Sequence, residues 1–194
     1  MSSLIVAKAQ EIALFLSRFL RKPNQIGSVL PSSKFLAQKM IASVSWHQVD
    51  SMAELGAGTG AITQYIPKAV KKNTKVLLFE KDPYLRSLLE KRYSNFYCYE
   101  DCCELQLGMQ NEKIEQLDCI LCGLPFFNFS QPIRDQLMAQ IYKSLKPDGL
   151  FIAFQYSQQM KKQLSQHFDI EEILFVPMNV PPAFVYICRK KERC

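Results

Sequence analysis

Glu54-Leu-Gly-Ala-Gly-Thr-Gly60 is the stretch of this sequence that decides the predicted fold. Residues 49–54, which lead into it, form a short run typical of a buried strand. Glycines directly after a strand allow a sharp turn and a close approach of the backbone to a ligand, because they carry no Cβ atom. We therefore predict a strand, a glycine loop and a helix over 60–66.

The rest of the chain alternates short apolar runs with helical patterns. Further strands are expected at 75–80, 95–99, 117–122, 150–156, 170–176 and 183–189, and further helices at 83–93, 131–145 and 158–166. This alternation predicts an α/β fold with a seven-stranded, mostly parallel, doubly wound sheet. Only 177–182 separates the last two strands, which is too short for a parallel crossover, so they should form an antiparallel hairpin.

Two helices are expected before the first strand. Residues 4–20 place apolar side chains at helical spacing, which predicts an amphipathic helix. The charged residues among them, and the lack of a small-residue cleavage site, argue against a signal peptide or a spanning helix. A second helix should begin at 31–33. We divide the chain into an N-terminal helical segment, 1–45, and a domain over 46–194.

The charge balance points to an anionic partner. The chain has 194 residues, of which 48% are apolar, and this is enough for one domain of ordinary size. Its formal net charge is +6 and its pI is near 8.9. Such a balance favours nucleic acid or an anionic membrane surface, and charge alone does not choose between them.

The cysteines are expected to be reduced thiols. There are seven, an odd number, and no secretory signal precedes them, so we expect a cytoplasmic protein. Cys119 and Cys122 have the spacing of half a zinc site. They lie inside the apolar run 117–122, and no second ligand pair has matching spacing, so we interpret them as small core residues and expect no metal.

The glycine spacing separates two kinds of nucleotide-containing ligand. A dinucleotide fingerprint reads G-x-G-x-x-G, whereas Gly60 comes one residue too early for it. Glu80 ends the second strand, where a carboxylate can accept hydrogen bonds from both hydroxyls of a ribose. An ordinary exposed glutamate is the alternative. Asp101 follows the third strand at the same edge of the sheet, where it can accept from an exocyclic adenine amine.

Together, the glycine loop, Glu80 and Asp101 resemble the successive cofactor motifs of class I S-adenosylmethionine-dependent methyltransferases. The resemblance implies the Rossmann-like methyltransferase fold, with S-adenosylmethionine as cofactor and S-adenosylhomocysteine as product. It implies that the glycine loop lies at the amino-acid part of the cofactor, Glu80 at its ribose and Asp101 at its adenine. The cofactor-binding residues expected on this basis are Glu54, Gly56, Ala57, Gly58, Gly60, Glu80, Lys81, Asp101, Cys102 and Gly123.

Two other stretches, Ile26-Gly-Ser-Val-Leu-Pro-Ser-Ser33 and Gly123-Leu-Pro-Phe-Phe-Asn-Phe129, resemble bacterial phospholipid N-methyltransferases, which methylate phosphatidylethanolamine. Residues 151–156 and 179–186 are similar to that family too, so the match spans about residues 10–190. The resemblance implies methylation of a lipid amine at an anionic membrane surface, on its inner face. The helix at 4–20 then lies in the bilayer interface, packs on the domain, or packs on the domain in solution and moves to lipid.

The same family is related to rRNA adenine dimethylases, which carry Asn, a hydrophobic residue, Pro and an aromatic residue after the fourth strand. In those enzymes the asparagine amide accepts from the target adenine. Gly123 occupies that position here and has no side chain to do so. We also expect no C-terminal helical module after the sheet. Nucleic acid is therefore the less favoured partner. Methylation of rRNA adenine or of a small molecule, and a non-catalytic binding role, remain alternatives.

Methyl transfer to an amine is an in-line attack of the neutral nitrogen on the sulfonium methyl, so the protein mainly positions and desolvates the amine. Ring faces attract a methylated ammonium, and an arginine suits a phosphate. Core packing is the alternative for the aromatic residues, and solvent exposure for the arginine. The residues expected to act on the amine are Phe126, Asn128 and Tyr156, and those expected to bind the rest of the substrate are Leu124, Pro125, Phe127, Phe129 and Arg134.

Overall fold

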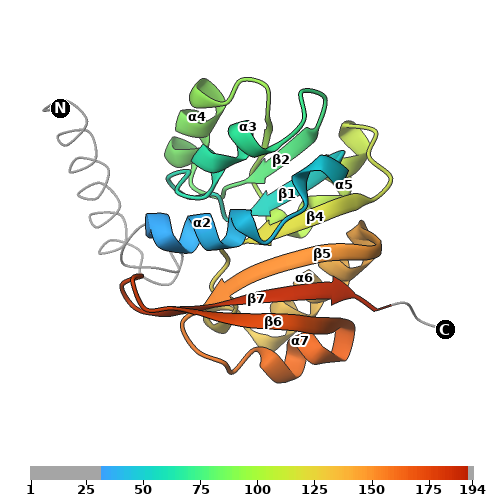
Figure 1. Cartoon of the computed structure of the whole chain (residues 1–194). Coiled ribbons are helices and arrows are strands. Elements are labelled where there is room, and N and C mark those ends of the chain that lie inside the picture. The colour runs from blue at the N-terminus through green and yellow to red at the C-terminus, as the bar shows by residue number, and fades with distance from the viewer. Residues whose placement is uncertain (1–31, 192–194) are drawn as a thin grey trace, which may run out of the picture.

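The computed structural model describes residues 32–191, and a single seven-stranded sheet forms its centre (Figure 1). The strand order is β3-β2-β1-β4-β5-β7-β6. The strands are β1 (Ser51–Leu55), β2 (Lys75–Phe79), β3 (Tyr97–Tyr99), β4 (Leu117–Cys122), β5 (Leu145–Gln155), β6 (Phe168–Val176) and β7 (Ala183–Lys190). Strands β1 to β5 pair in parallel, whereas β7 runs antiparallel to both β5 and β6. The predicted sheet and its terminal hairpin are confirmed.

Helices cover both faces of the sheet. The described α-helices are α2 (Lys34–Ala42), α3 (Ile66–Ala69), α4 (Pro83–Arg92), α5 (Leu105–Asn111), α6 (Gln131–Ser144) and α7 (Lys161–His167). The first three contribute to one apolar cluster, and the last three to a second. Strand residues alternate between these clusters, because successive side chains of a strand point to opposite faces. In β1, Met52 belongs to the first cluster, and Ala53 and Leu55 to the second.

The helix α2 belongs to the same core as the sheet. Its N-cap Ser33 accepts a hydrogen bond from the Leu36 amide, which caps the start of the helix in the usual way. Leu36, Ala37 and Met40 are fully buried in the first cluster. The predicted helix at 4–20 lies outside the described residues, and the division of the chain at 45/46 stays a prediction. Among residues 32–191, no helix is long and apolar enough to cross a membrane.

The helices of the structure differ from the prediction in two places. The helix expected over 60–66 is wrong in extent, because a 3-10 helix, η2 (Thr63–Tyr65), and the short α3 stand there. Gly60 has a positive φ of 81°, which a right-handed helix does not accept, and Pro67 is allowed only in a first turn. The helix α5 was not predicted. Its Gly108 lowers helix propensity, yet a Cβ there would come 3.1 Å from the Phe79 ring.

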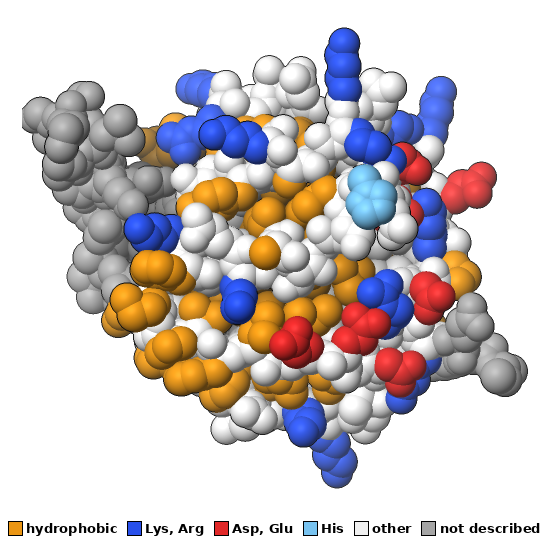
Figure 2. Space-filling model, viewed as in Figure 1, with side chains coloured by type: hydrophobic (Ala, Val, Ile, Leu, Met, Phe, Trp, Pro, Cys, Tyr) orange, Lys and Arg blue, Asp and Glu red, His pale blue; other side chains and the backbone are white. Residues whose placement is uncertain are grey.

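Polar and apolar side chains are separated along β6. Asp169, Glu171 and Glu172 lie at its amino end, whereas Phe175 at its carboxyl end is exposed. Figure 2 shows the consequence: apolar side chains gather where β6 turns into β7, and acidic ones toward the other end of these strands. The outer strand β6 therefore presents an acidic surface at its amino end and an apolar surface at its carboxyl end.

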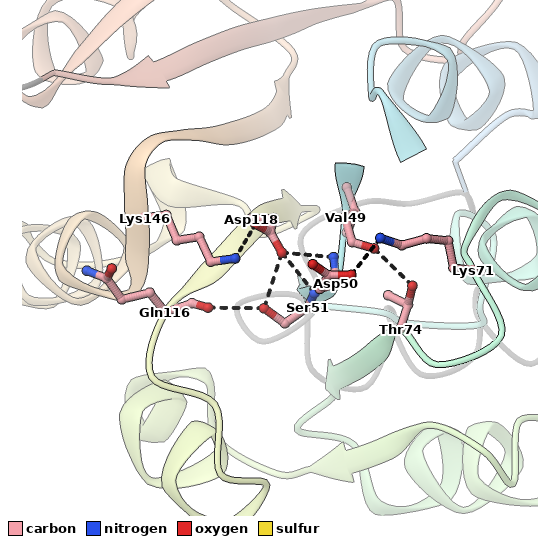
Figure 3. A network of polar contacts seen from close by, with 8 residues as sticks. All are labelled: Val49, Asp50, Ser51, Lys71, Thr74, Gln116, Asp118 and Lys146. Carbon is pink, nitrogen blue, oxygen red and sulfur yellow. Dashed lines mark hydrogen bonds and ion pairs between the residues drawn. The ribbon is translucent and has the colours of Figure 1, made fainter. Parts of the chain in front are cut away.

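Asp118 joins the amino ends of three strands (Figure 3). Its Oδ2 accepts from the Asp50 and Ser51 amides at 2.9 and 3.0 Å, and its Oδ1 accepts from Lys146 Nζ at 2.5 Å. Burial opposes the charge of Asp118, but these donors outweigh burial and lower its pKa. A pocket of about 160 Å³ opens nearby, between 43–49 and 146–150. It lies at the opposite edge of the sheet from the glycine loop.

Candidate functional site

The glycine loop lies where the carboxyl ends of β1, β2 and β4 meet. Gly56, Gly58 and Gly60 have φ values of 76°, 57° and 81°, in the left-handed region that favours glycine. The amides of Gly56 and Ala57 both donate to the Phe79 carbonyl, at 2.9 and 3.0 Å, which ties the loop to β2. A Cβ at Gly58 would meet nothing within 4 Å. The loop thus presents open backbone at the edge of the sheet.

Glu80 meets the glycine loop, as the parallel strand ends predict. Its Oε2 accepts from the Gly58 amide at 2.7 Å, and its Oε1 accepts from the Asp82 amide at 2.9 Å. Burial raises its pKa, and the two amide donors oppose that rise. Each carboxylate oxygen can accept more than one hydrogen bond. Glu80 is therefore held in place by backbone and keeps acceptor capacity for hydroxyl groups of a ligand.

Glu54 lies fully buried beneath the glycine loop. Its Oε2 accepts from Thr63 Oγ1 at 2.7 Å. Its Oε1 is also buried, and it has no hydrogen-bond partner among the described residues. Burial raises the pKa of Glu54 to about 8, although the Thr63 hydroxyl opposes the rise. A cationic amino group of a ligand at Oε1 would favour the charged carboxylate and supply the missing hydrogen bond.

Asp101 and its neighbours form the adenine end of the expected site. Asp101 caps the 3-10 helix η3 (Cys102–Glu104), and its Oδ1 accepts from the Cys103 amide at 2.8 Å. One ligand atom each from Asp101, Cys102 and Cys103 lies within 4.8 Å of the others. Burial raises the pKa of both the Cys102 and the Cys103 thiol. Lys81, expected to contact the cofactor, is exposed.

The cysteines that suggested half a zinc site point away from each other. Cys119 lies in the first apolar cluster and Cys122 in the second, on opposite faces of the sheet. Burial raises the pKa of Cys122 to about 12, and that of Cys119 further. Two side chains on opposite faces of the sheet do not share a metal.

Two loops approach each other closely at Gly123. Its amide donates to the Leu55 carbonyl at 2.8 Å. A Cβ at this position would come 3.1 Å from the Gly56 carbonyl oxygen and 3.4 Å from the Phe154 ring. Any larger residue would therefore push on the glycine loop. The end of β4 and the end of β1 lie backbone against backbone at the centre of the site.

The loop after β4 divides its aromatic residues between the core and the surface. In the 3-10 helix η4 (Phe126–Asn128), Phe126 is buried in the second apolar cluster, so packing accounts for this side chain. Phe127 is 42% exposed, and Asn128 is exposed as well. Phe129, like Leu124, is partly buried against the second cluster. Phe127 and Asn128 are thus the most exposed members of this loop, and only Phe126 is closed to a substrate.

Arg134 lies against this loop. Its guanidinium stacks over the Phe127 ring, 5.7 Å from the ring centroid, and donates to Gln131 Oε1 at 2.5 Å. Its Nε is buried and has no hydrogen-bond partner among the described residues. The arginine is therefore neither fully exposed nor ion-paired within the part of the chain that the structure describes. An anionic group near Phe127 would find a fixed cation.

Gln155 is a site residue that the sequence patterns did not single out. It is buried at the end of β5, and its Nε2 donates to the Leu124 carbonyl at 3.0 Å, which fixes the start of the loop after β4. Tyr156 follows it, partly buried, and contacts the Phe154 ring edge to face at 5.9 Å between centroids. A polar residue that ends an apolar strand was the available signal for Gln155.

Comparison with known proteins identifies the family. The family model described as Methyltransferase domain matches residues 53–153. Ornithine lipid N-methyltransferase from Singulisphaera acidiphila is 31% identical over 186 residues, which cover 93% of this chain and 96% of that protein. This chain is a class I S-adenosylmethionine-dependent methyltransferase. The cofactor is S-adenosylmethionine, and S-adenosylhomocysteine is the product. The glycine loop, Glu80 and the partnerless oxygen of Glu54 suit the amino-acid part and the ribose of that cofactor.

One further sequence and one solved structure are also similar to this methyltransferase. Ribosomal RNA small subunit methyltransferase A from Coxiella burnetii is 28% identical over 122 residues, which cover 61% of this chain but only 45% of that enzyme. The crystal structure of N-methyltransferase NodS from Bradyrhizobium japonicum, in complex with S-adenosylhomocysteine, superposes with a TM-score of 0.63 at 14% identity, covering 81% of this chain and 88% of that one. At this identity, the structural likeness shows the fold alone.

Proposed function

We propose that this methyltransferase methylates the amine of a membrane lipid head group, as a peripheral protein at the inner face of the membrane. The observation that carries the proposal is the extent of the match to ornithine lipid N-methyltransferase, which covers 93% of this chain and 96% of that protein. The match to the rRNA enzyme covers less than half of its length. An end-to-end match favours a shared acceptor class more than a match confined to the cofactor domain does.

Two lipid acceptors follow from these observations. The name of the full-length relative makes an ornithine lipid the first to test, and the sequence resemblance makes phosphatidylethanolamine the second. Both offer a primary amine and an anionic group, a carboxylate or a phosphate. The amine would lie near Asn128 and Tyr156, and the anionic group near Arg134, whose buried Nε has a hydrogen to donate.

The cofactor roles proposed for this site follow the contacts described above. Glu54 would accept from the ammonium of the methionine part, Glu80 from the ribose hydroxyls and Asp101 from the adenine amine. The glycine loop gives backbone access, and Gly123 keeps the space between the two loops free. Cys102 would lie beside the adenine, and Lys81 at the outer rim. When bound, the cofactor supplies a sulfonium methyl as the electrophile.

The chain itself has to present a neutral amine. Residues 123–129 contain no titratable side chain, so the amine loses its proton to water rather than to this loop. The exposed Phe127 ring and Tyr156 would flank the nitrogen, because ring faces attract the methylated ammonium that forms. Asn128 would orient the head group, and the buried Phe126 would support the loop from below. Positioning and removal of water are then the main contributions of the protein to the rate.

An acceptor screen tests the proposal. The purified protein is incubated with methyl-labelled S-adenosylmethionine and with ornithine lipid, phosphatidylethanolamine or small-subunit rRNA in turn, the lipids dispersed in mixed micelles. We expect label in one or both lipids, and a loss of at least tenfold in kcat/KM for Asn128→Ala, with S-adenosylhomocysteine affinity unchanged. Label in rRNA alone would refute the lipid proposal and establish the alternative. Leu88→Ala, on the exposed face of α4, is the matched control and should keep full activity.

A further inference from the structure

The turn between β6 and β7 carries exposed apolar side chains. We call residues 175–184, together with Phe35 at the start of α2, the apolar tip. Its members Phe175, Met178 and Val180 are 54%, 61% and 65% exposed, and Phe35 is 41% exposed. Phe175 also packs on Phe184, with 5.1 Å between ring centroids. An exposed apolar cluster of this kind is typical of a surface that contacts a membrane, a ligand or another protein.

The tip is built with its polar residue inside and its apolar residues outside. Asn179 is buried, its Oδ1 accepts from the Ser33 amide at 2.9 Å, and its Nδ2 donates to the Pro181 carbonyl at 2.7 Å. The first bond ties the turn to the start of α2, and the second lies within the turn. Met178 and Val180, on either side of Asn179, are left facing solvent. This is the reverse of an ordinary surface turn, whose polar residues face water.

The apolar tip lies at the same end of the sheet as the methyl-transfer site, the end at which the parallel strands finish. Val176 pairs with Ala183 where β6 turns into β7, and Phe184 pairs with Gln155 at the end of β5. Gln155 is the residue that holds the Leu124 carbonyl of the loop after β4. A surface that contacts the tip therefore also faces the side of the molecule on which the acceptor would enter.

The charges around the tip suit an anionic lipid surface. No charged residue occurs between Glu172 and Arg189, so β6 and β7 bring no acidic side chain to this end (Figure 2). Lys34 lies over the Phe35 ring, with its Nζ 5.0 Å from the ring centroid. Apolar side chains that enter the acyl boundary beside a cation that meets anionic head groups are the features of an interfacial membrane contact.

We propose that the apolar tip inserts into an anionic lipid bilayer and docks the enzyme with its acceptor site toward the head groups. The proposal rests on the proposed lipid acceptor, and it adds the surface through which the enzyme meets the membrane. The contact lies within residues 32–191 and does not require the predicted helix at 4–20.

Vesicles without an acceptor amine separate docking from catalysis. Partition onto vesicles of phosphatidylglycerol and phosphatidylcholine in equal parts is measured by co-sedimentation for the full chain and for Met178→Asp/Val180→Asp. We expect the tip variant to bind the vesicles about tenfold less. Two apolar side chains no longer enter the bilayer, and two negative charges approach an anionic surface. Leu88→Asp/Leu107→Asp removes comparably exposed leucines from α4 and α5 and should partition as the wild type does.

A second variant reports insertion into the bilayer directly, through a gain of signal rather than a loss of binding. Met178→Trp should show a blue shift of tryptophan fluorescence when the same vesicles are added, whereas Leu88→Trp should not. Unchanged partition of the aspartate variant, or no shift for Met178→Trp, would overturn the proposal. So would dissociation of a dimer by the aspartate pair without any change in partition, which would mean that a second copy covers the tip.

The same variants distinguish failure of the tip from failure of the lipid function. In mixed micelles with a short-chain acceptor lipid, the aspartate variant should keep wild-type kcat and S-adenosylhomocysteine affinity, since its substitutions touch no proposed site residue. If the wild type methylates lipid in micelles, and the aspartate variant binds vesicles as well as the wild type does, only the tip proposal fails. If the wild type docks through the tip but methylates no lipid, the acceptor proposal fails.

Discussion

Replacing Glu54 by glutamine should remove a pH dependence of stability that the wild type carries. Burial raises the pKa of Glu54 from 4.5 to about 8. Between these pH values the folded protein holds a proton that the unfolded chain has released. The free energy of unfolding therefore falls as the pH rises through this window, by up to about 1.4 kcal/mol per pH unit, and levels off above pH 8. Glu54→Gln has no proton to lose, so this contribution disappears.

Urea unfolding at a series of pH values from about 5 to about 9 measures this slope for both proteins. The difference between wild type and variant should change by about 3 to 5 kcal/mol across the window. Thr63→Val is the matched control, because Thr63 donates to Oε2 of Glu54 at 2.7 Å and favours its charged form. Without this donor the pKa should rise further, and the slope should extend beyond pH 8. Parallel curves for wild type and Glu54→Gln would refute the reasoning.

Three further substitutions test the site and its support. Gly123→Ala should weaken S-adenosylhomocysteine binding by roughly tenfold, measured by calorimetry, because its Cβ would come 3.1 Å from the Gly56 carbonyl oxygen. Gln155→Leu should lower kcat/KM for the lipid roughly tenfold, because it leaves the Leu124 carbonyl without its donor. Asp118→Asn should lower the free energy of unfolding by about 1 to 3 kcal/mol. The stabilisation by this carboxylate should also be lost as the pH falls below 3.8, through its lowered pKa.

Two of these changes have a readout that should stay constant. Gln155→Leu and Asp118→Asn should leave cofactor affinity unchanged, the first because its partner lies in the acceptor loop and the second because it lies at the other edge of the sheet. Wild-type cofactor affinity in Gly123→Ala would contradict the close approach of the two loops. Equal loss of cofactor binding and turnover in Gln155→Leu would mean that Gln155 supports the whole site rather than the acceptor loop.

The sheet and the cofactor site at its carboxyl end were predictable from the sequence, because alternating apolar runs and helical patterns indicate parallel strands. Parallel strands bring their carboxyl ends to one edge, so Glu80 and Gly58 had to meet, and they share a hydrogen bond of 2.7 Å. The helix α5 was not predictable from helix propensity, because Gly108 is needed there for close packing on Phe79. The extent of the helix after the glycine loop was missed because positive φ values postpone its start.

Which aromatic residues of the loop after β4 are buried and which are exposed could not be predicted from the sequence. Phe126 and Phe127 are identical neighbours, and only the single turn of η4 decides that the first is buried and the second exposed. The same holds for Asn179, which looks like an ordinary turn residue but lies inside. Such choices follow from tertiary contacts that no local pattern contains.

The position of the transferred methyl group tests the central claim most directly. The protein is incubated with S-adenosylmethionine that carries a deuterated methyl group, together with a bacterial lipid extract, and the products are fragmented in a mass spectrometer. We predict that the deuterated methyl is found on the amine nitrogen of a lipid head group, and that Glu80→Ala, which loses the carboxylate at the glycine loop, leaves the extract unlabelled. Label on a hydroxyl or carboxyl oxygen, or an unlabelled extract with the wild-type protein, would contradict the account.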